Sequence, residues 1–571
     1  MAQVVEQPAA AGAPVEDRPW LAYYDPGVPH SIEYPWVAVP ELLAHAAAAH
    51  ARRPATWFFG ATISYRRLAD LVDRFAGALY DCGVRQGDRV AIMLPNCPQF
   101  VIAFYATLRL GAVAVPTNPL YKTREVALQL ADAGAETVIV LDLLYETVKH
   151  ALPETSVRTT IVTGLQDFMP WWVARLYPLK LRRGGKRLPA LQGEPVRQFR
   201  ALLDHAPWSA PAPATPDSLA VLQYTGGTTG VPKGAMLTHR NLVANAVQAW
   251  HWQPAAIKRP GEGSNLCVTP FFHVYGLSAG MNTSIFGGVC MLLLPRFVAS
   301  DVVAVIRKHR PSRFPGVPTM YLALAEHPGI KPADCSSLQM CISGSAPLQG
   351  SIQEAFREKA GGHVVEGYGL TEAAPVVLCN PLRRPRTGAA GVPFPDTHVA
   401  IVDRDTGKRL PPGMAGELMV RGPQVMRGYW HRPDETAAIF FDGWLRTGDI
   451  AAMDHEGYVT ILDRAKDIII ASGFNIYPRE VEEMLCTHPA VQEAAVVGVP
   501  DTYRGETVKA FLVLKSGAQA TEREIIDYVR TRIAVFKAPT AVEFRTALPR
   551  TTIGKVMRRA LVPTPDERMH R

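Results

Sequence analysis

The sequence predicts an α/β fold: a large N-terminal domain of α/β subdomains that includes a β-rich subdomain, followed by a small α+β domain at the C-terminus. Its 571 residues are too many for one hydrophobic core, because single cores stop growing at roughly 250–300 residues. Up to about residue 395, short apolar runs alternate with helix-like stretches, as in a buried parallel sheet. Beyond that point, strands separated by Gly, Pro and Asp turns predict the β-rich subdomain.

The individual elements follow from these runs in chain order. We expect buried strands at residues 136–141, 219–225, 289–295 and 399–403, and a helix at 351–361. Further strands are expected at 416–422, 458–464, 491–500 and 508–515, and a helix at 522–533. The segment DRAKDIII, which begins at Asp463, separates the β-rich part from the tail, so we place the domain boundary there. The tail then has roughly a hundred residues, which is an ordinary domain size.

Residues 274–295 carry no charged side chain, which raises the question of a membrane-spanning helix. A span needs about 20 consecutive, predominantly apolar residues. Here Asn282, Thr283, Ser284 and several glycines interrupt the stretch. We therefore expect a buried helix followed by a strand.

Composition and charge limit the class of protein and its partners. A hydrophobic fraction of 48% and a charged fraction of 20% are typical of soluble globular proteins. The net charge of +8 suits anionic small molecules or an acidic membrane surface, and no nucleic-acid-binding motif is present. The cysteines form no Cys-x-x-Cys pair and the N-terminus lacks a basic, apolar leader, so we expect reduced thiols and a cytoplasmic location. Oligomeric state is not readable from the sequence, and a homodimer is one option.

The stretch 168–188 departs from the α/β pattern by combining aromatic with basic residues. They are Phe168, Trp171, Trp172, Tyr177, Arg175, Lys180, Arg182, Arg183, Lys186 and Arg187. This combination suits the interface of an anionic bilayer, which would place the protein peripherally at the inner membrane face. The alternative is a surface excursion whose aromatic side chains pack against the protein. Pro170 and Pro178 are expected to break any long amphipathic helix here.

The segment YTGGTTGVPKGAMLTHRN, residues 224–241, is the strongest candidate for an anion site. It follows a predicted strand and contains four glycines, four threonines and Lys233. Glycines allow a ligand to approach the backbone, while hydroxyls and an ammonium suit a polyphosphate. The segment is not a Walker A loop, because Lys233 lies between Pro232 and Gly234, and it is not Gly-x-Gly-x-x-Gly. A glycine-threonine turn without a ligand remains the alternative.

Three further segments could complete a nucleotide site. EGYGLTEAAP contains Tyr368, which could stack on a base, and Glu372, whose oxygens suit Mg²⁺; a buried turn with a structural glutamate is the alternative. RTGD places Asp449 in a turn, where a carboxylate could hold ribose hydroxyls or form a plain Asx turn. PRTTIGK places Lys555 after a glycine near the basic C-terminus, where a lone lysine is usually only solvated.

Six motifs in one order decide between these alternatives: YTGGTTGVPKGAMLTHRN, FFHVYG, EGYGLTEA, WLRTGD, DRAKDIIIASGFNIYPREVE and PRTTIGK. With them, residues 40–560 resemble the adenylate-forming enzymes, specifically the AMP-forming acyl-CoA synthetases, and most of all bacterial long-chain fatty-acid CoA ligases. The resemblance implies an N-terminal adenylation domain at 1–463, a hinge at 464–467 and a mobile C-terminal domain at 468–571. It also implies ATP and Mg²⁺ as cofactors. A carboxylic acid would react with ATP to give acyl-AMP and pyrophosphate, and CoA would then take the acyl group.

The resemblance assigns roles to individual residues. Lys555 would bridge the reacting carboxylate and the α-phosphate, and Glu372 with Thr228 would bind Mg²⁺. Lys466 would be the hinge, and Gly473, which has no side chain, would leave room for the pantetheine of CoA. The residues implied to bind ATP are Thr225, Gly226, Gly227, Thr228, Thr229, Gly230, Lys233, Gly344, Ser345, Ala346, Glu366, Gly367, Tyr368, Gly369, Thr371, Asp449, Ile461, Arg464 and Lys555.

The motif FFHVYGLSAGMNTSIFGG bears on the acid. His273 stands where amino-acid-activating relatives carry an Asp, so an amino acid is not expected; His273 could orient the carboxylate, or be structural. Leu277 stands where some long-chain members carry an aromatic gate. Small residues could line an acyl tunnel or permit close helix packing; they are Gly276, Ala279, Gly280, Gly287 and Gly288.

We expect a long-chain fatty acid as the substrate. A medium-chain or aryl acid is an alternative, as is a carrier-protein thiol in place of CoA. Amide formation or light emission from the same adenylate, and a non-enzymatic acyl or nucleotide sensor on the same fold, also remain open.

Overall fold

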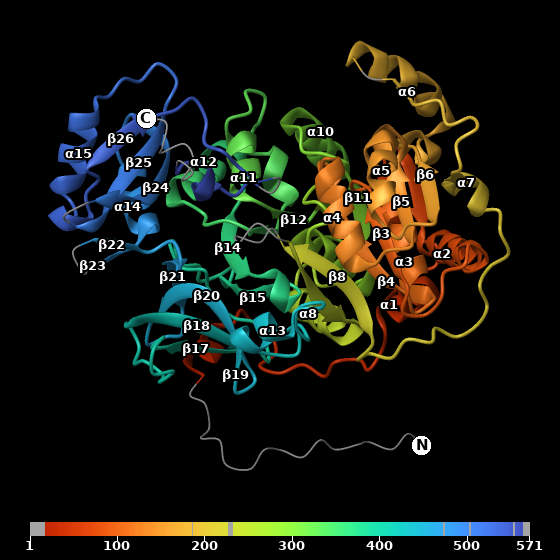
Figure 1. Ribbon diagram of the computed structural model, residues 1–571, viewed down its shortest axis with the longest axis horizontal. Coiled ribbons are helices and arrows are strands. Elements are labelled where there is room, and N and C mark those ends of the chain that lie inside the picture. The colour runs from red at the N-terminus through yellow and green to blue at the C-terminus, as the bar shows by residue number, and fades with distance from the viewer. Residues whose placement is uncertain are drawn as a thin grey trace.

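The computed structural model describes residues 18–185, 187–225, 232–471, 474–501, 504–551 and 554–562. Four β-sheets organise these described residues, and two of the sheets are mainly parallel and lie in the N-terminal part. This arrangement matches the predicted α/β class. Figure 1 shows the C-terminal sheet and its helices at one side of the molecule, with the β-rich part beside it.

The first parallel sheet has seven strands in the order β7-β6-β5-β3-β4-β8-β9. Only the β8–β9 pair is antiparallel. The strands are β3 Arg89–Met93, β4 Val113–Pro116, β5 Thr137–Leu141, β6 Thr159–Thr163, β7 Arg197–Gln198, β8 Leu219–Thr225 and β9 Lys233–Thr238. The helices between them are α3 Pro98–Arg109, α4 Thr123–Ala133, α5 Tyr145–Ala151, α6 Trp171–Arg183 and α7 Phe199–Leu202.

The second sheet has nine strands in the order β16-β15-β14-β13-β12-β10-β11-β1-β2. Its central strands, from β1 through β11, β10, β12 and β13 to β14, are parallel. The strands are β1 Pro54–Phe58, β2 Ala61–Ser64, β10 Ser264–Cys267, β11 Cys290–Leu293, β12 Arg313–Gly316, β13 Met340–Ser343, β14 Val364–Gly369, β15 Val376–Cys379 and β16 Val392–Pro393. The associated helices are α1 Val39–Ala49, α2 Tyr65–Asp81, α8 His239–His251, α9 Thr283–Phe286, α10 Ala299–His309, α11 Pro318–Ala325 and α12 Gly350–Ala360.

The largest hydrophobic core joins these two sheets. It contains apolar side chains of both sheets and of helices α1, α2, α3 and α8. The uncharged stretch that raised the question of a membrane span belongs to this core, as a π-helix at Gly276–Asn282 followed by α9 and β11. The prediction of a buried helix and a strand is thus confirmed. No helix among the described residues is both long and apolar enough to cross a bilayer.

The β-rich part is a five-stranded antiparallel sheet, in which β21 pairs with β20. Its elements are β17 His398–Val402, β18 Ala415–Arg421, α13 Pro433–Ile439, β19 Phe440–Phe441, β20 Trp444–Met453 and β21 Val459–Arg464. The C-terminal sheet follows with β22 Ile469–Ala471, α14 Pro478–Cys486, β23 Phe474–Ile476, β24 Val491–Asp501, β25 Gly505–Leu514, α15 Glu522–Arg530 and β26 Ala541–Phe544. The chain passes from one sheet to the other between β21 and β22, where the sequence analysis places the hinge.

Helix α6 corrects one prediction. Pro178 was expected to break a helix in this stretch, yet it lies inside a helix of 13 residues that begins directly after Pro170. Proline removes one backbone hydrogen bond, but an exposed helix can replace that bond with water. None of the α6 residues is buried, and Figure 1 shows α6 projecting from the body of the protein.

Candidate active site

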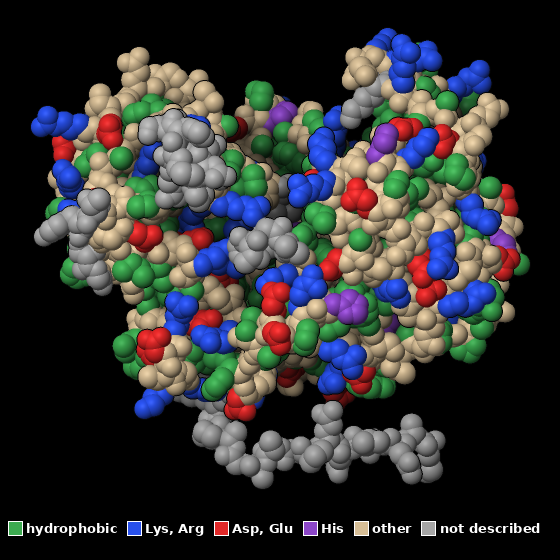
Figure 2. Space-filling view, viewed as in Figure 1, with side chains coloured by type: hydrophobic (Ala, Val, Ile, Leu, Met, Phe, Trp, Pro, Cys, Tyr) green, Lys and Arg blue, Asp and Glu red, His purple; other side chains and the backbone are tan. Residues whose placement is uncertain are grey.

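One cavity of about 580 Å³ brings together residues that lie between Thr225 and Lys555 in the chain. Its wall is formed by the nine-stranded sheet, the β8–β9 pair, the β-rich part and the C-terminal tail. Figure 2 shows the molecule hollowed between the C-terminal part and the seven-stranded sheet, with Lys and Arg side chains along the hollow. The predicted residues that line the cavity are Thr225, Lys233, His273, Gly344, Ser345, Gly367, Tyr368, Gly369, Thr371, Glu372, Arg464 and Lys555.

Lys555 enters this cavity from a tight turn in the tail. The backbone N–H of Thr551 donates to the carbonyl of Lys555 at 2.7 Å, and Gly554 closes the turn with a φ of +81°. A Cβ at Gly554 would lie 2.9 Å from Oγ1 of Thr319 in α11, so the turn rests directly on the N-terminal domain. Loss of solvation in the cleft, together with repulsion from Arg464, lowers the pKa of Lys555 to about 8.

Tyr368 lines the cavity, and a hydrogen bond from its hydroxyl to a residue outside the cavity wall fixes the position of the ring. The Tyr368 hydroxyl donates to the carboxylate of Asp449, and Arg464 Nε lies 2.5 Å from the other oxygen of that carboxylate. Asp449 and Arg464 are partners across the β20–β21 ladder. Asp449 therefore lies behind Tyr368, only 3% exposed, and does not itself line the cavity. Its predicted contact with ribose remains a prediction.

Ser345 lies in the turn after β13 and opens toward the same part of the cavity. Its φ is +68°, a conformation that is uncommon outside glycine and that turns the backbone sharply. Its buried Oγ has no hydrogen-bond partner among the described residues. Gly344 packs closely beside it, because a Cβ there would lie 3.2 Å from the ring of Tyr275. The flat ring of Tyr368 and the Ser345 hydroxyl, which has no described hydrogen-bond partner, thus lie at one region of the cavity. This region suits a heterocyclic base.

Thr225 and Lys233 are partners across the β8–β9 ladder, and both line the cavity. The ammonium of Lys233 forms an ion pair with Glu435 and lies 5.4 Å from the ring centroid of Tyr429. Gly226, Gly227, Thr228, Thr229 and Gly230, which were predicted to bind phosphate, lie outside the described residues, as does Gly473. The two ends of the predicted phosphate loop are therefore at the cavity.

Glu372 offers a suitable oxygen ligand for Mg²⁺. One of its carboxylate oxygens accepts a hydrogen bond of 2.6 Å from the Tyr429 hydroxyl, which orients the group. Among the residues that the structure describes, no cluster of three or more His, Cys, Asp or Glu side chains could hold a metal ion. The single carboxylate of Glu372 fits Mg²⁺, because proteins commonly bind this ion through one or two carboxylates together with substrate phosphates and water.

His273 is a neutral hydrogen-bond donor to the cavity. Burial lowers its pKa to about 4, so the ring carries no charge at neutral pH. Its Nδ1 accepts a hydrogen bond of 3.3 Å from the backbone N–H of Tyr275. A neutral imidazole whose Nδ1 accepts must carry its proton on Nε2. His273 can therefore donate from Nε2 to an anionic group in the cavity.

Four predicted site residues do not reach the cavity wall. Besides Asp449, they are Ala346, Glu366 and Ile461. Glu366 is buried, which raises its pKa to about 7, while Arg479 of α14 lies 3.8 Å away and opposes the increase. The carbonyl of Ile461 accepts a hydrogen bond of 2.7 Å from the same Arg479. Glu366 and Ile461 thus contact the C-terminal domain instead of the cavity.

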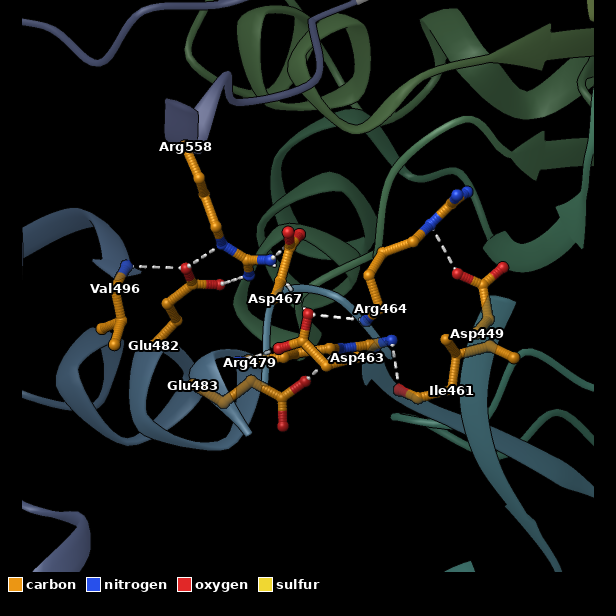
Figure 3. Close-up of polar contacts among 10 residues, drawn as sticks. All are labelled: Asp449, Ile461, Asp463, Arg464, Asp467, Arg479, Glu482, Glu483, Val496 and Arg558. Atoms are coloured by element: carbon orange, nitrogen blue, oxygen red, sulfur yellow. Dashed lines mark hydrogen bonds and ion pairs between the residues drawn. The ribbon is translucent and has the colours of Figure 1, made fainter. Parts of the chain in front are cut away.

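An ion-pair network fixes the tail that carries Lys555. Arg558 contacts Glu482 of α14 at 2.8 Å and Asp463 of β21 at 2.9 Å, and lies 3.3 Å from Asp467 (Figure 3). Asp463 precedes the predicted hinge, and Lys466 lies within it. One guanidinium therefore joins the tail, the C-terminal domain and the last strand of the β-rich part. Asp463, Asp467 and Glu482 lie within the motif DRAKDIIIASGFNIYPREVE, but no sequence pattern indicated their pairing with Arg558, which lies 76 positions after Glu482.

The glycines of the predicted acyl tunnel mostly serve close packing. A Cβ at Gly287 would lie 2.0 Å from the Trp250 ring, and one at Gly276 would lie 2.2 Å from the carbonyl oxygen of Pro270. Ala279 does line the cavity. The cavity also reaches residues for which the sequence predicted no role at the site: Trp250, Gln253, Asn265, Thr283, Ser284, Arg313 and Met340. The charge of Arg313 within an otherwise apolar strand was the one available signal.

Known proteins match this chain over nearly its whole length. The model of the AMP-binding enzyme family matches residues 43–430, and that of the AMP-binding enzyme C-terminal domain matches residues 480–555. A long-chain-fatty-acid–CoA ligase of Bacillus subtilis (strain 168) is 43% identical over 557 residues, which cover 97% of this chain and 99% of that protein.

Solved structures agree with this match. ATP-bound MatB from Rhodopseudomonas palustris superposes with a TM-score of 0.81 at 30% identity, covering 92% of this chain and 98% of that one. The apo structure of the same protein, with the same coverage and identity, gives a TM-score of 0.73. The chain belongs to the AMP-binding enzyme family.

Proposed function

We propose that this protein is an ATP-dependent acid–thiol ligase that converts a long-chain fatty acid to its acyl-CoA, with AMP and pyrophosphate as the other products. The observation that carries the proposal is the meeting of Lys555 with Lys233, Glu372 and His273 in one cavity. The fatty-acid substrate is supported by the 43% identical ligase from Bacillus subtilis.

The first half-reaction requires a carboxylate to approach an α-phosphate that is itself anionic. Fixed positive charge in a site with little water lowers such a barrier, by several kcal/mol in typical cases. Lys555 would contact both anionic groups, and His273 would donate from Nε2 to the carboxylate and orient it; both residues line the cavity. Lys233 would neutralise the outer phosphates. Mg²⁺, held by Glu372, would add further charge neutralisation at these phosphates.

The second half-reaction needs a different lining of the same site. The thiol of CoA must reach the acyl-adenylate, and the tail turn that holds Lys555 rests on Thr319 beside the cavity. We therefore place the hinge at Lys466, in the turn between the two sheets, where a few residues can absorb the backbone change of a domain rotation. Gly473 is our candidate for the residue that then lines the pantetheine channel.

Pyrophosphate release across a panel of fatty, medium-chain and aryl acids tests the proposal. We expect long-chain acids to give the highest kcat/KM, and acyl-CoA to form only with CoA present. Lys555→Ala should abolish pyrophosphate release but still form acyl-CoA from supplied acyl-adenylate. Retained ATP–pyrophosphate exchange in that variant would contradict the role of Lys555. Transfer to a carrier-protein phosphopantetheine but not to CoA would change the proposed acceptor.

We also propose that helix α6 contacts an anionic membrane surface. Trp171 is 80% exposed, and Trp172, Leu176 and Leu179 are all more than half exposed. Basic side chains accompany them on the same helix: Arg175, Lys180, Arg182 and Arg183. Exposed aromatic and aliphatic side chains beside Lys and Arg are typical of helices that lie at an anionic bilayer. Lysines and arginines also cover this projection in Figure 2.

Co-sedimentation with phosphatidylglycerol vesicles tests this contact. The double variant Trp171→Ala/Trp172→Ala should pellet several-fold less than the unchanged protein, with unaltered activity on soluble acids. Trp36→Ala is a matched control, because Trp36 is also exposed, at 63%, but lies far from α6 in the sequence. Equal pelleting of the double variant and the control would remove the membrane proposal.

A further inference from the structure

The far end of the cavity is formed by three adjacent parallel strands. Asn265 of β10, Arg313 of β12 and Met340 of β13 are partners in register, and all three line the cavity. They lie at the amino ends of their strands, whereas Gly344 and the nucleotide region follow the carboxyl ends. Gly316 lies three positions after Arg313 along β12, which is about 10 Å of strand. The cavity thus runs under the sheet from the reacting centre to Arg313.

Arg313 is a buried cation without a carboxylate partner. It is 4% exposed, and its Nε donates to Gln253 Oε1 at 2.6 Å while Nη1 donates to Ser312 Oγ at 2.8 Å. Nη2 donates to the carbonyl of Ile257. No described Asp or Glu side chain forms an ion pair with it. A guanidinium has five N–H donors, so two remain after these three bonds.

A charge in such a place is costly unless something compensates it. The Trp250 ring lies 5.5 Å from the guanidinium carbon of Arg313, which gives partial compensation through the ring face. Burial lowers the pKa of Arg313 to about 10, so the group remains charged at neutral pH. The protein thus keeps a net positive charge at the end of its acyl cavity.

The same end also holds an unfilled hydrogen-bond acceptor. The Nδ2 group of Asn265 donates to the carbonyl of Ala279 at 3.1 Å and to Ser284 Oγ at 3.0 Å. Its Oδ1 is buried and has no partner among the described residues. Asn265 and Arg313 are neighbours across the β10–β12 ladder. Both residues line the cavity, and a plain methyl group at this end would leave the spare donors of Arg313 and the Oδ1 acceptor of Asn265 without partners.

We infer that the cavity is built for acids that carry an oxygen function at the end opposite the reacting carboxylate, either an ω-hydroxyl or an ω-carboxylate. An ω-carboxylate would accept two hydrogen bonds from Arg313 and supply the missing counter-charge. An ω-hydroxyl would accept from Arg313 and donate to Asn265 Oδ1. This inference rests on the proposed function and names the substrate class within it.

A matched acid panel tests the inference. Octanoate, dodecanoate and hexadecanoate are compared with their ω-hydroxy and α,ω-dicarboxylic counterparts by the rate of acyl-CoA formation. At the length that fits best, we expect an oxygenated acid to exceed the plain acid in kcat/KM by about tenfold, the effect of one charge-assisted hydrogen bond. The hydroxy and dicarboxylic arms show which oxygen function is preferred. A higher kcat/KM for the plain acid at every length would overturn the inference.

Two variants act on Arg313 by opposite routes. Arg313→Leu removes the cation, and Gln253→Glu supplies a carboxylate at its Nε while preserving the shape of the side chain. Both should bring the ratio of oxygenated to plain acid to about one or below. Because Gln253→Glu adds an ion pair to the fold, it remains informative if Arg313→Leu does not fold. An unchanged ratio in Gln253→Glu would refute the role of Arg313.

Lys308→Gln is the control, because it removes one exposed positive charge from the end of α10, close in sequence to Arg313. Its ratio should equal that of the unchanged protein. The panel also distinguishes failure of the proposed function from failure of the inference about the far end of the cavity. If no acid supports acyl-CoA formation, the proposed function fails; if plain acids react best, only the inference about the far end fails.

Discussion

The pKa of Lys555 gives a quantitative prediction for the first half-reaction. Loss of solvation and the nearby Arg464 lower this pKa to about 8, and only the protonated ammonium can neutralise the approaching anions. The protonated fraction is nearly complete at about pH 7 and about one-tenth at about pH 9. We therefore expect kcat/KM for adenylation to fall about tenfold over this interval, since this parameter reports groups of the free enzyme.

ATP–pyrophosphate exchange at limiting ATP and saturating acid measures this profile. Lys555→Arg is the decisive comparison, because a guanidinium stays charged throughout the range. That variant should be slower at about pH 7, yet its profile should stay flat up to about pH 9. Parallel losses in the two proteins would show that another group titrates, and would refute the assignment. Because the pKa of Lys555 is lower in the folded protein, the charged lysine destabilises the folded state. This loss of stability disappears as the pH rises from about 8 toward the ordinary lysine pKa of 10.5.

The remaining predictions concern the hinge, the tail and the acyl cavity. Lys466→Pro should slow thioester formation far more than adenylation, because proline restricts the backbone change; equal losses in the two half-reactions would count against the hinge. Arg558→Leu leaves Glu482 without its ion pair and should lower the free energy of unfolding by about 3 kcal/mol, the lower end for buried pairs, because Arg558 is 23% exposed. Urea melts measure this, and a loss below about 1 kcal/mol would mean that water replaces the pair. Gly287→Ala places a Cβ 2.0 Å from the Trp250 ring, which should lower the free energy of unfolding by about 1–3 kcal/mol. The same contact should push the indole toward the cavity, so that activity on the longest acids is lost first. An unaltered chain-length profile would contradict that path.

Elements with a strong local signal were predictable. The strand expected at 219–225 is β8 with the same bounds, and the helix expected at 351–361 is α12, Gly350–Ala360. A short run of apolar residues between turns has few other stable arrangements. The helix at 276–282 was expected, but the sequence pattern did not indicate that its turns are π-helical. Helix α6 was not expected, because a proline such as Pro178 usually breaks a helix by removing a backbone hydrogen bond. In an exposed helix such as α6, water can replace that bond.

The candidate site was predictable where one motif carries one role. Lys555, Lys233, Glu372 and His273 were all expected there, and all line the cavity. Contacts between distant segments were not predictable from a single sequence. Arg313 and Gln253 are 60 positions apart, and Arg558 and Glu482 are 76 apart. Such pairs are decided by the register of strands and the docking of domains, which leave no local pattern.

The ion pair between Lys233 and Glu435 has a consequence for how nucleotide enters. This ammonium already has an anionic neighbour in Glu435, so a phosphate that approaches Lys233 does not meet a bare positive charge. We expect binding there to be an exchange, in which the phosphate takes the place of the carboxylate and Glu435 turns to water. Smaller anions that cannot reach the rest of the cavity gain little from that exchange. We therefore expect the carboxylate to disfavour free phosphate and sulfate, whereas a triphosphate, which makes further contacts in the cavity, would displace it.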